Sequence, residues 1–197
     1  MNYYKTHIPN FAQTAVPIYS LLCKKKKFQW TEACEIAFTN LKNLLKNRIT
    51  LHSINEDLPF QLYTDASNVA SGAVLMQDEK PIEFYSKKFS PIEQRYSTYD
   101  RETFAIVDSI MHFRYRLIDR KFTVYTDHKP LIYWMQRPPP NERNARWLVK
   151  LQELDFEIKY IEGKIMYLQI FVVVPKKPNY PLLVKSIFKN RLMKMRT

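Results

Sequence analysis

Two stretches of the sequence end an alternating apolar pattern on the same three residues, Tyr-Thr-Asp. The first runs from Phe60 to Ser67 and places Asp65, and the second runs from Lys121 to His128 and places Asp127. Alternation of apolar and polar residues is typical of a β-strand with one buried face. Each stretch therefore predicts a strand that presents one carboxylate at its C-terminal end, at the rim of a sheet.

A helical pattern separates these two strands and adds a third acid. It extends from Glu93 to Leu117, and Glu102 lies on a face shared with Ala105 and Ile106. Three acids on two strands and one helix could converge on a divalent metal ion. Taken singly, each Asp fits a turn or a helix N-cap and the Glu fits a solvated face, so the prediction of a metal site depends on their combination.

The remaining patterns predict an α/β fold, with a five-stranded mixed sheet flanked by helices. Asp78 and Glu79 supply a polar turn, which favours an antiparallel meander of the first three strands. The fourth strand is expected to return parallel to the first across the helix, as a right-handed crossover. The expected strands are Phe60–Thr64, Ala73–Met76, Ile82–Ser86, Phe122–Thr126 and Phe156–Ile161.

Local signals predict where the helices begin and which faces they bury. Ser90-Pro91 is a typical helix start, with proline at the first position. The expected buried stripe of that helix is Phe104, Ile106, Val107, Ile110, Met111 and Phe113. A second helix, Asn141 to Leu154, carries Arg143, Arg146 and Lys150 on one face. That face fits either a track for nucleic-acid phosphates or ordinary solvated charge.

Gly72 is one of only two glycines and lies at the start of the expected second strand, beside the loop that follows Asp65. A glycine inside a strand indicates either a close approach of backbone or a β-bulge. The sequence leaves both interpretations open.

Residues 1–55 are expected to form a helical N-terminal segment. Thr31 is the expected N-cap of one helix. The apolar series of that helix is Ile36, Phe38, Leu41, Leu44 and Leu45. The basic run from Lys24 to Lys27 fits a solvated loop better than a phosphate contact. Cys23 and Cys34 have no further Cys or clustered His to complete a zinc site, so reduced thiols are expected.

Charge and hydropathy narrow the class of protein. The chain of 197 residues has a net charge of +12, but eight of its 31 Lys and Arg lie from Lys164 onward, where no acid occurs. The preceding part is only modestly basic, which permits a polyanionic partner without identifying one. No run of about 18 apolar residues and no apolar signal-peptide core occur. We therefore expect an unsecreted protein without a membrane partner, located in the cytoplasm or alternatively in the nucleus.

Several short runs, taken in order along the chain, resemble one known family. They are Leu62–Ser67, Gly72–Leu75, Tyr85–Lys88, Gln94–Ser97, Glu102–Val107, Tyr125–Leu131 and Ala145–Trp147. Together they resemble the RNase H-like domain of reverse transcriptases from gypsy-type LTR retrotransposons. The resemblance extends from about residue 2 to residue 164. It implies the RNase H-like fold, which agrees with the sheet expected above.

This resemblance implies a reaction and a set of site residues. Asp65, Glu102 and Asp127 match three of the family's four metal-binding carboxylates, with Mg²⁺ as the expected ion and Mn²⁺ as the alternative. The implied reaction is hydrolysis of the RNA strand of an RNA–DNA hybrid, which needs no side-chain nucleophile. The expected substrate contacts are Ser67, His128, Lys129 and Arg146.

The resemblance also divides the chain. Residues 1–55 resemble the end of a polymerase thumb and the connection that follows it, residues 56–164 form the RNase H-like domain, and residues 165–197 are a basic tail. Because Met1 lies downstream of the palm with its paired aspartates, this chain alone is not expected to copy a template. The expected partners are an RNA–DNA hybrid and the remaining reverse transcriptase and integrase parts of the parent polyprotein.

After Lys164 the sequence departs from the family pattern. The family continues with an Asn-Val-x-Ala-Asp helix whose Asp is the fourth metal ligand, whereas this chain has an apolar run and no acid beyond Glu162. Codons can be chosen for residues 165–171 that encode the present sequence in one frame. Read in the next frame, the same bases encode Asn-Val-Leu/Phe-Ala-Asp-Ile. A one-base deletion near the codon for Ile165 therefore explains the loss. We expect a frameshifted or disordered tail, with a domesticated basic tail as the alternative.

Loss of one carboxylate of four predicts impaired RNA cleavage. The alternative is a non-catalytic, nucleic-acid-binding remnant of a retroelement, which would bind hybrids in a salt-sensitive way without cleaving them. An integrase-like strand-transfer enzyme shares the sheet and the acidic metal ligands. The position of Glu102 on the first long helix, rather than on a late helix, argues against that class.

Overall fold

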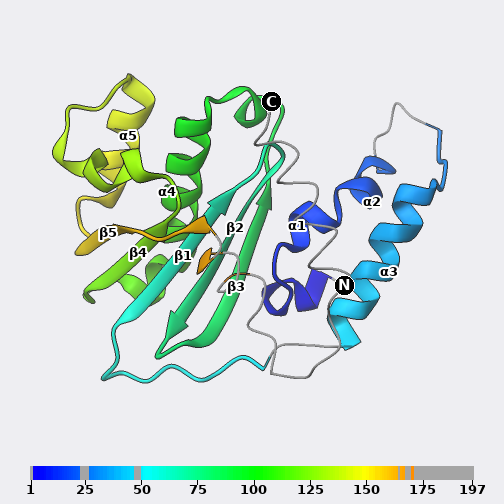
Figure 1. Cartoon of the computed structure of the whole chain (residues 1–197), viewed down its shortest axis with the longest axis horizontal. Helices are drawn as coiled ribbons and strands as arrows, with labels where there is room; N and C mark the ends of the chain where they lie inside the picture. The colour runs from blue at the N-terminus through cyan, green and yellow to red at the C-terminus, as the bar shows by residue number, and fades with distance from the viewer. Residues whose placement is uncertain (1, 23–26, 47–49, 164, 167–169, 171–197) are drawn as a thin grey trace.

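The computed structural model describes residues 2–22, 27–46, 50–163, 165–166 and 170, which are built around a five-stranded mixed sheet (Figure 1). The strands lie in the order β3-β2-β1-β4-β5. Their bounds are β1 Phe60–Ala66, β2 Ala70–Gln77, β3 Lys80–Lys88, β4 Phe122–Thr126 and β5 Phe156–Tyr160. The five strands expected from the sequence are all present, which confirms the α/β fold class.

Strands β1, β2 and β3 form the predicted antiparallel meander. Asp78 and Glu79 make the turn between β2 and β3 with φ angles of 47° and 59°. Positive φ at both central residues is the pattern of a tight hairpin turn whose twist matches that of the strands. The register shift of β2 against β3 lies between Leu75 and Met76, so the irregularity is not at Gly72.

Helix α4 (Thr98–Leu117) connects the meander to β4 and covers one face of the sheet. Strand β4 lies parallel to β1, as predicted. The core between helix and sheet includes Phe60, Leu62, Ala73, Leu75, Ile106, Ile110, Phe113 and Val124. Burial of such apolar surface stabilises a fold by roughly 25 cal/mol per Å². This packing holds α4 rigidly over the strands that carry the acids.

The start of α4 differs from the sequence prediction. Ser90 and Glu93 bond reciprocally through side chain and backbone, but the Ser90-Pro91 turn leads only into a short 3₁₀ helix, η2 (Glu93–Arg95), because the backbone becomes extended at Tyr96 (ψ 148°). The true N-cap is Ser97, whose Oγ accepts a hydrogen bond from the Asp100 N–H at 3.1 Å. Met111 is 38% exposed, so it does not belong to the buried stripe.

The N-terminal helices lie on the other side of the sheet from α4, and the first two of them contact β2 and β3 (Figure 1). They are η1 Asn2–His7, α1 Phe11–Thr14, α2 Val16–Ser20 and α3 Glu32–Lys46. The Ala12 N–H donates to Ser86 Oγ of β3 at 3.0 Å. The helical N-terminal segment is therefore present as predicted and is in direct contact with the sheet.

Helix α3 buries part of its predicted apolar series: Leu41 is buried, and Leu44 and Leu45 are half-buried against the same cluster. Cys34, Ala37 and Leu41 are buried, at spacings of three and four that form one helical stripe. Ile36 and Phe38 are 55% and 37% exposed because they flank this stripe. Cys34 is a free thiol. Cys23 and three of the four lysines in the basic run, 24–26, lie outside the described residues.

A second apolar cluster covers the face of the sheet opposite α4. It consists of Tyr63, Val74, Met76, Phe84, Met166 and Ile170. Met166 and Ile170 belong to the segment expected to be a tail, and they are only 2% and 1% exposed. Met166 and Ile170 of that segment therefore pack against the sheet. Residues 167–169 and 171–197 lie outside the described residues.

The segment between β4 and β5 contains η3 (Lys129–Gln136) and α5 (Glu142–Leu151). Helix α5 begins after Asn141, whose Oδ1 accepts a hydrogen bond from the Asn144 N–H at 3.0 Å. The helix ends three residues before the predicted Leu154. Among the helices that the structure describes, none has the length and apolar character required to cross a membrane.

Candidate metal centre

Asp65 lies near the C-terminal end of β1, as the sequence predicted. The turn that follows is closed by Ser67, whose hydroxyl donates to the Ala70 carbonyl at 2.9 Å. The same hydroxyl accepts from the N–H groups of Val69 and Ala70 at 3.3 and 3.0 Å. This turn holds the end of the strand that carries Asp65.

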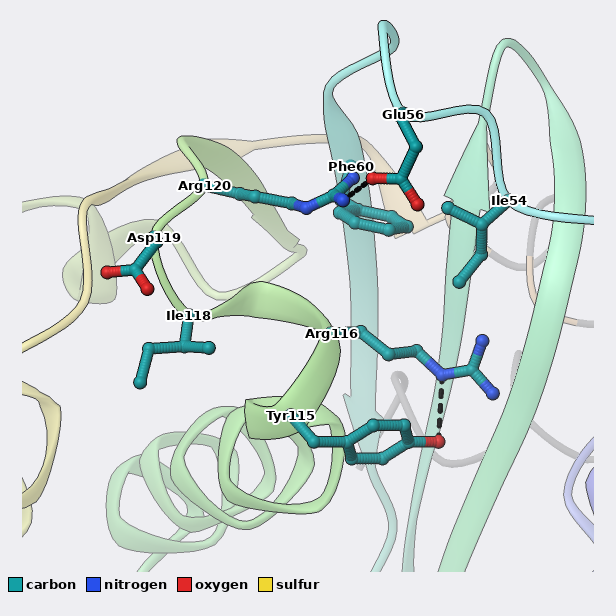
Figure 2. Close-up of a pocket in the computed structure, with 8 residues that line it drawn as sticks. All are labelled: Ile54, Glu56, Phe60, Tyr115, Arg116, Ile118, Asp119 and Arg120. Carbon is teal, nitrogen blue, oxygen red and sulfur yellow. Dashed lines mark hydrogen bonds and ion pairs between the residues drawn. The ribbon is translucent and has the colours of Figure 1, made fainter.

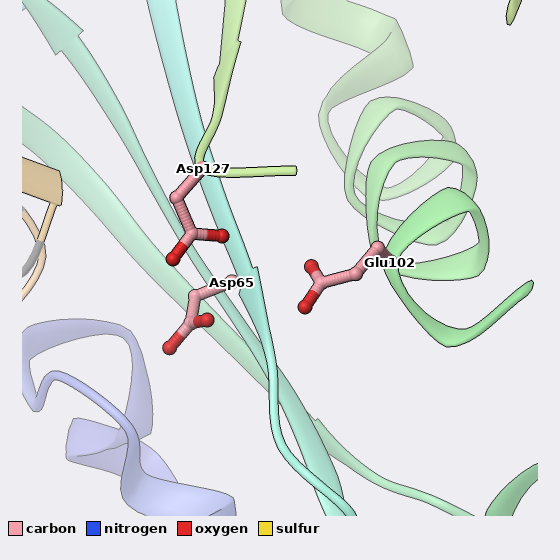
Figure 3. A group of neighbouring side chains, drawn as sticks. All are labelled: Asp65, Glu102 and Asp127. Atoms are coloured by element: carbon pink, nitrogen blue, oxygen red, sulfur yellow. The ribbon is translucent and has the colours of Figure 1, made fainter. Parts of the chain in front are cut away.

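Glu102 lies in the second turn of α4 and is only 7% exposed. Its neighbours Thr103, Ala105 and Ile106 are fully buried. The helix begins directly after the Ser97 cap, and the face that buries Thr103, Ala105 and Ile106 also carries Glu102. Because this face packs on the sheet, the Glu102 carboxylate is directed at the strand ends (Figure 3).

Asp127 follows β4 directly. The preceding residue, Thr126, is buried, and its Oγ1 accepts a hydrogen bond from the His128 N–H at 3.2 Å. The Thr126 carbonyl accepts from the Ile161 N–H at 3.0 Å, which extends the β4–β5 pairing past the strands. A Cβ atom added at Gly163 would lie 3.1 Å from Asp127 Oδ2.

The three carboxylates meet at one edge of the sheet (Figure 3). Each offers an oxygen atom, and these atoms all lie within 4.8 Å of one another. At this separation two ionised carboxylates repel by on the order of 3 kcal/mol at an effective dielectric constant of about 20. A divalent cation would offset that repulsion, and an all-oxygen ligand set suits hard cations. The predicted convergence of Asp65, Glu102 and Asp127 is therefore present, and the site could hold a metal ion.

A buried polar network beside the acids was not predicted. Asp100, two residues before Glu102, accepts from Asn144 Nδ2 at 2.8 Å and from Arg143 Nη1 at 3.3 Å. Asn144 Oδ1 accepts in turn from Trp134 Nε1 at 3.0 Å. The network joins α4 to η3 and α5. The sequence signal for this network was Asp100, an acid in the first turn of a helix. A favourable interaction with the helix dipole explains an acid at that position as well as a polar network does.

The four expected substrate contacts have different surroundings. The Ser67 hydroxyl is engaged within the β1–β2 turn. The His128 ring packs edge-on against an aromatic ring of α4, and Lys129 Nζ lies 4.8 Å from the centroid of the Tyr160 ring. Arg146 is exposed on α5. Lys129 and Arg146 are thus the two of this set with exposed side chains available to a partner.

The three cations on the predicted basic face of α5 have different surroundings. Arg143 lies over the Tyr96 ring, with its guanidinium carbon 3.9 Å from the centroid, and it pairs with Asp100. Arg146 and Lys150 are exposed. Arg143 therefore joins α5 to the start of α4, and only the other two cations remain for a phosphate track.

Residues 55–154 match the model of one protein family, described as the RNase H-like domain found in reverse transcriptase. The chain belongs to this family. The matched range of this RNase H-like domain contains Asp65, Glu102 and Asp127. The N-terminal helices lie before it.

Curated relatives of this RNase H-like domain are transposon polyproteins of the gypsy type. The chain is 40% identical over 164 residues to the retrovirus-related Pol polyprotein from transposon 297 of Drosophila melanogaster, covering 82% of this chain and 15% of that protein. It is 37% identical over 172 residues to the transposon Tf2-3 polyprotein of Schizosaccharomyces pombe, covering 83% and 13%. The chain thus spans about one seventh of the length of these relatives.

A solved structure shares the fold. The foamy viral protease-reverse transcriptase in complex with an RNA/DNA hybrid superposes with a TM-score of 0.66 at 17% identity, covering 91% of this chain and 24% of that chain. This similarity confirms the RNase H-like fold.

A separate pocket of about 670 Å³ lies at the opposite end of β1 from Asp65 (Figure 2). Ile54, Phe60 and Ile118 supply its apolar lining. Its two arginines have partners: Arg116 Nη2 lies 2.7 Å from the Glu83 carboxylate, and Arg120 pairs with Glu56. Because it lies at the other end of β1, the pocket is distinct from the acidic site.

Proposed function

We propose that this RNase H-like domain hydrolyses the RNA strand of an RNA–DNA hybrid, using Mg²⁺ or alternatively Mn²⁺. The observation that carries the proposal is the group of carboxylate oxygens from Asp65, Glu102 and Asp127, which lie within 4.8 Å of one another although they come from three separate elements. The RNA/DNA hybrid bound by the foamy viral protein supports the choice of substrate.

The three acids would hold the divalent ions. When bound, such ions activate a water molecule and stabilise the negative charge on the leaving oxygen. The chain itself provides rigid placement, because Asp65 and Asp127 end neighbouring strands and Glu102 projects from a helix packed on the sheet. Exposed Lys129 and Arg146 provide positive charge for substrate phosphates, which position a nucleic acid without reading its sequence. Contacts to the 2′-hydroxyl would distinguish RNA from DNA.

We further propose that this chain cleaves less efficiently than a domain with four carboxylates. No acid occurs after Glu162, so the site has three acids for ions that the family holds with four. The three acids remain sufficient to bind one ion. The alternative, a binding remnant without catalysis, rests on the same missing acid.

A cleavage assay tests both proposals. The full chain is incubated in Mg²⁺ with a hybrid that carries a labelled RNA strand, beside Asp65→Asn and a frame-restored variant that regains the Ala-Asp motif. We expect weak cleavage by the wild type, none by Asp65→Asn and faster cleavage by the restored variant. Asp57→Asn, an exposed site outside the acidic group, is the matched control.

Each result has a defined meaning. Cleavage that persists in Asp65→Asn would exclude the three acids as the site. Equal turnover of the wild-type and frame-restored chains would refute the predicted impairment. Salt-sensitive binding of the hybrid without any cleavage by the wild type, unchanged by Asp65→Asn, would favour the binding remnant.

A further inference from the structure

Asn10 combines an uncommon backbone conformation with a buried side chain. Its φ and ψ angles are 48° and 34°, in the left-handed region, and the residue is 8% exposed. Few residues other than glycine adopt this conformation, although asparagine tolerates it better than most. Asn10 precedes α1 directly, and its carbonyl accepts a hydrogen bond from the Thr14 N–H at 3.1 Å. The chain therefore turns sharply at Asn10 and presents its side chain to the sheet.

The side-chain amide of Asn10 lies directly over Gly72. A Cβ atom added at Gly72 would come 2.0 Å from Asn10 Oδ1 and 3.2 Å from its Cγ. No side chain fits in that space. Gly72 does not have a positive φ, so backbone conformation does not require a glycine there. The glycine is explained by close approach, and the approaching group is a side chain from 62 positions earlier in the sequence.

Gly72 is also the register partner of Asp65. Directly paired residues of antiparallel strands project from the same face of the sheet, with Cβ positions about 4.5–5.5 Å apart. The Asn10 amide therefore fills the space next to the Asp65 side chain, on the side of β2. Figure 3 shows the N-terminal ribbon beside Asp65, away from Glu102.

We propose that Asn10 is a positioning residue for the metal centre, an inference that rests on the proposed metal-dependent function. By filling the space over Gly72, the amide excludes the Asp65 rotamers that turn toward β2 and keeps the carboxylate facing Glu102 and Asp127. The hydrogen bond from Ala12 to Ser86 holds the segment in place. Residues 2–20, which lie outside the range matched by the family, are thus part of the functional unit.

Two substitutions separate this role from simple packing. Asn10→Gly removes the amide and keeps the backbone, because glycine adopts a φ of 48° without strain. Gly72→Ala keeps the amide but places a methyl group where it lies. Asp119→Gly is the matched control, because Asp119 also has a positive φ, 59°, and lines the pocket at the opposite end of β1.

The readout is Mn²⁺ affinity of the full chain, measured by electron paramagnetic resonance well below the thermal midpoint of each variant. Loss of an outer contact that orients a metal-ligating group weakens metal binding about 10- to 100-fold. We expect a loss of this size in Asn10→Gly and in Gly72→Ala, and none in Asp119→Gly. The double variant should bind Mn²⁺ no more weakly than the more affected single variant, because both substitutions disrupt the same contact between residues 10 and 72.

The outcomes distinguish this inference from the function on which it rests. Wild-type Mn²⁺ affinity in folded Asn10→Gly overturns the role of Asn10 and leaves the proposed function standing. Failure of the wild-type chain to bind Mn²⁺ overturns the proposed function and the role of Asn10 with it. If Gly72→Ala does not fold, Asn10→Gly decides alone.

Discussion

Gly163 contacts Asp127 so closely that an added Cβ would lie 3.1 Å from Oδ2 of the carboxylate. Strands β4 and β5 are parallel neighbours, so the residues that follow them emerge at the same edge of the sheet. One of the chain's two glycines thus leaves room for an acid of the metal centre, and the other leaves room for Asn10 beside Asp65.

Gly163→Ala should therefore displace the Asp127 carboxylate. We expect Mn²⁺ affinity to fall about tenfold, the lower end of the usual effect of disturbing a ligand's support. Calorimetric titration with Mn²⁺ measures the change. Ile165→Ala, at an exposed site in the same segment, is the control and should bind normally. Unchanged affinity in Gly163→Ala would mean that the carboxylate has space to adjust.

Asn144→Ala should destabilise the fold. Asn144 is fully buried, and its removal leaves Trp134 Nε1 without its partner and leaves Asp100 Oδ1 with only a long, 3.5 Å contact to Asn141. A buried polar group left unpaired costs about 1–3 kcal/mol, so we expect a loss of this order in the free energy of unfolding. Urea denaturation measures it. Arg146→Ala on the same helix should change stability by less than about 0.5 kcal/mol.

Arg146→Ala should instead weaken hybrid binding. Because Arg146 is exposed, loss of one phosphate contact should reduce the slope of log affinity against log salt by about one. Fluorescence anisotropy with a labelled hybrid, across a salt series, gives that slope. Arg143→Ala is the contrasting variant: it loses the contacts to Asp100 and Tyr96, so its main effect should be on stability. An unchanged slope in Arg146→Ala would remove this residue from the phosphate track.

The stability of the domain should fall at acidic pH, partly through Glu83. Burial raises the pKa of Glu83, but His112, Arg116 and Tyr115 together outweigh burial, so the net pKa lies below the ordinary value. The folded state therefore holds this carboxylate ionised more strongly than the unfolded chain does. Its contribution is present above the unfolded pKa of about 4.3 and is lost as pH falls through the lower folded value.

Glu83→Gln should make the loss of stability between neutral pH and about pH 3 shallower, because glutamine does not titrate in this range. Urea unfolding at a series of pH values gives the dependence. Glu32→Gln, at an exposed position of α3, is the control and should keep the wild-type slope. The same slope in Glu83→Gln as in the wild type would contradict this account.

The strands and the three acids were predictable because both depend on local patterns. Strand residues alternate between two faces, so β1 and β4 reveal their period and their final Asp without any knowledge of their neighbours. Helix limits were less predictable. Ser90-Pro91 has the composition of a helix start, but the backbone becomes extended at Tyr96, and α4 begins only after the cap at Ser97.

Contacts between distant segments escaped prediction. On α3, Ile36 and Phe38 are as apolar as Leu41, and only the partner surface decides which of them is buried. Arg143 has the spacing of a phosphate-binding face, yet Asp100 and Tyr96 engage it. Spacing along one helix contains no information about which charges lie opposite it.

The order of residues alone determined that this chain has a five-stranded sheet with acids at its strand ends, because hydrophobic periodicity and turn chemistry act over a few residues. Only the tertiary structure decided that Asn10 lies over Gly72, that Asn144 supports Asp100 and that Gly163 makes room for Asp127. Such contacts depend on how separate segments pack in three dimensions, since close packing leaves space for one arrangement of side chains at each contact.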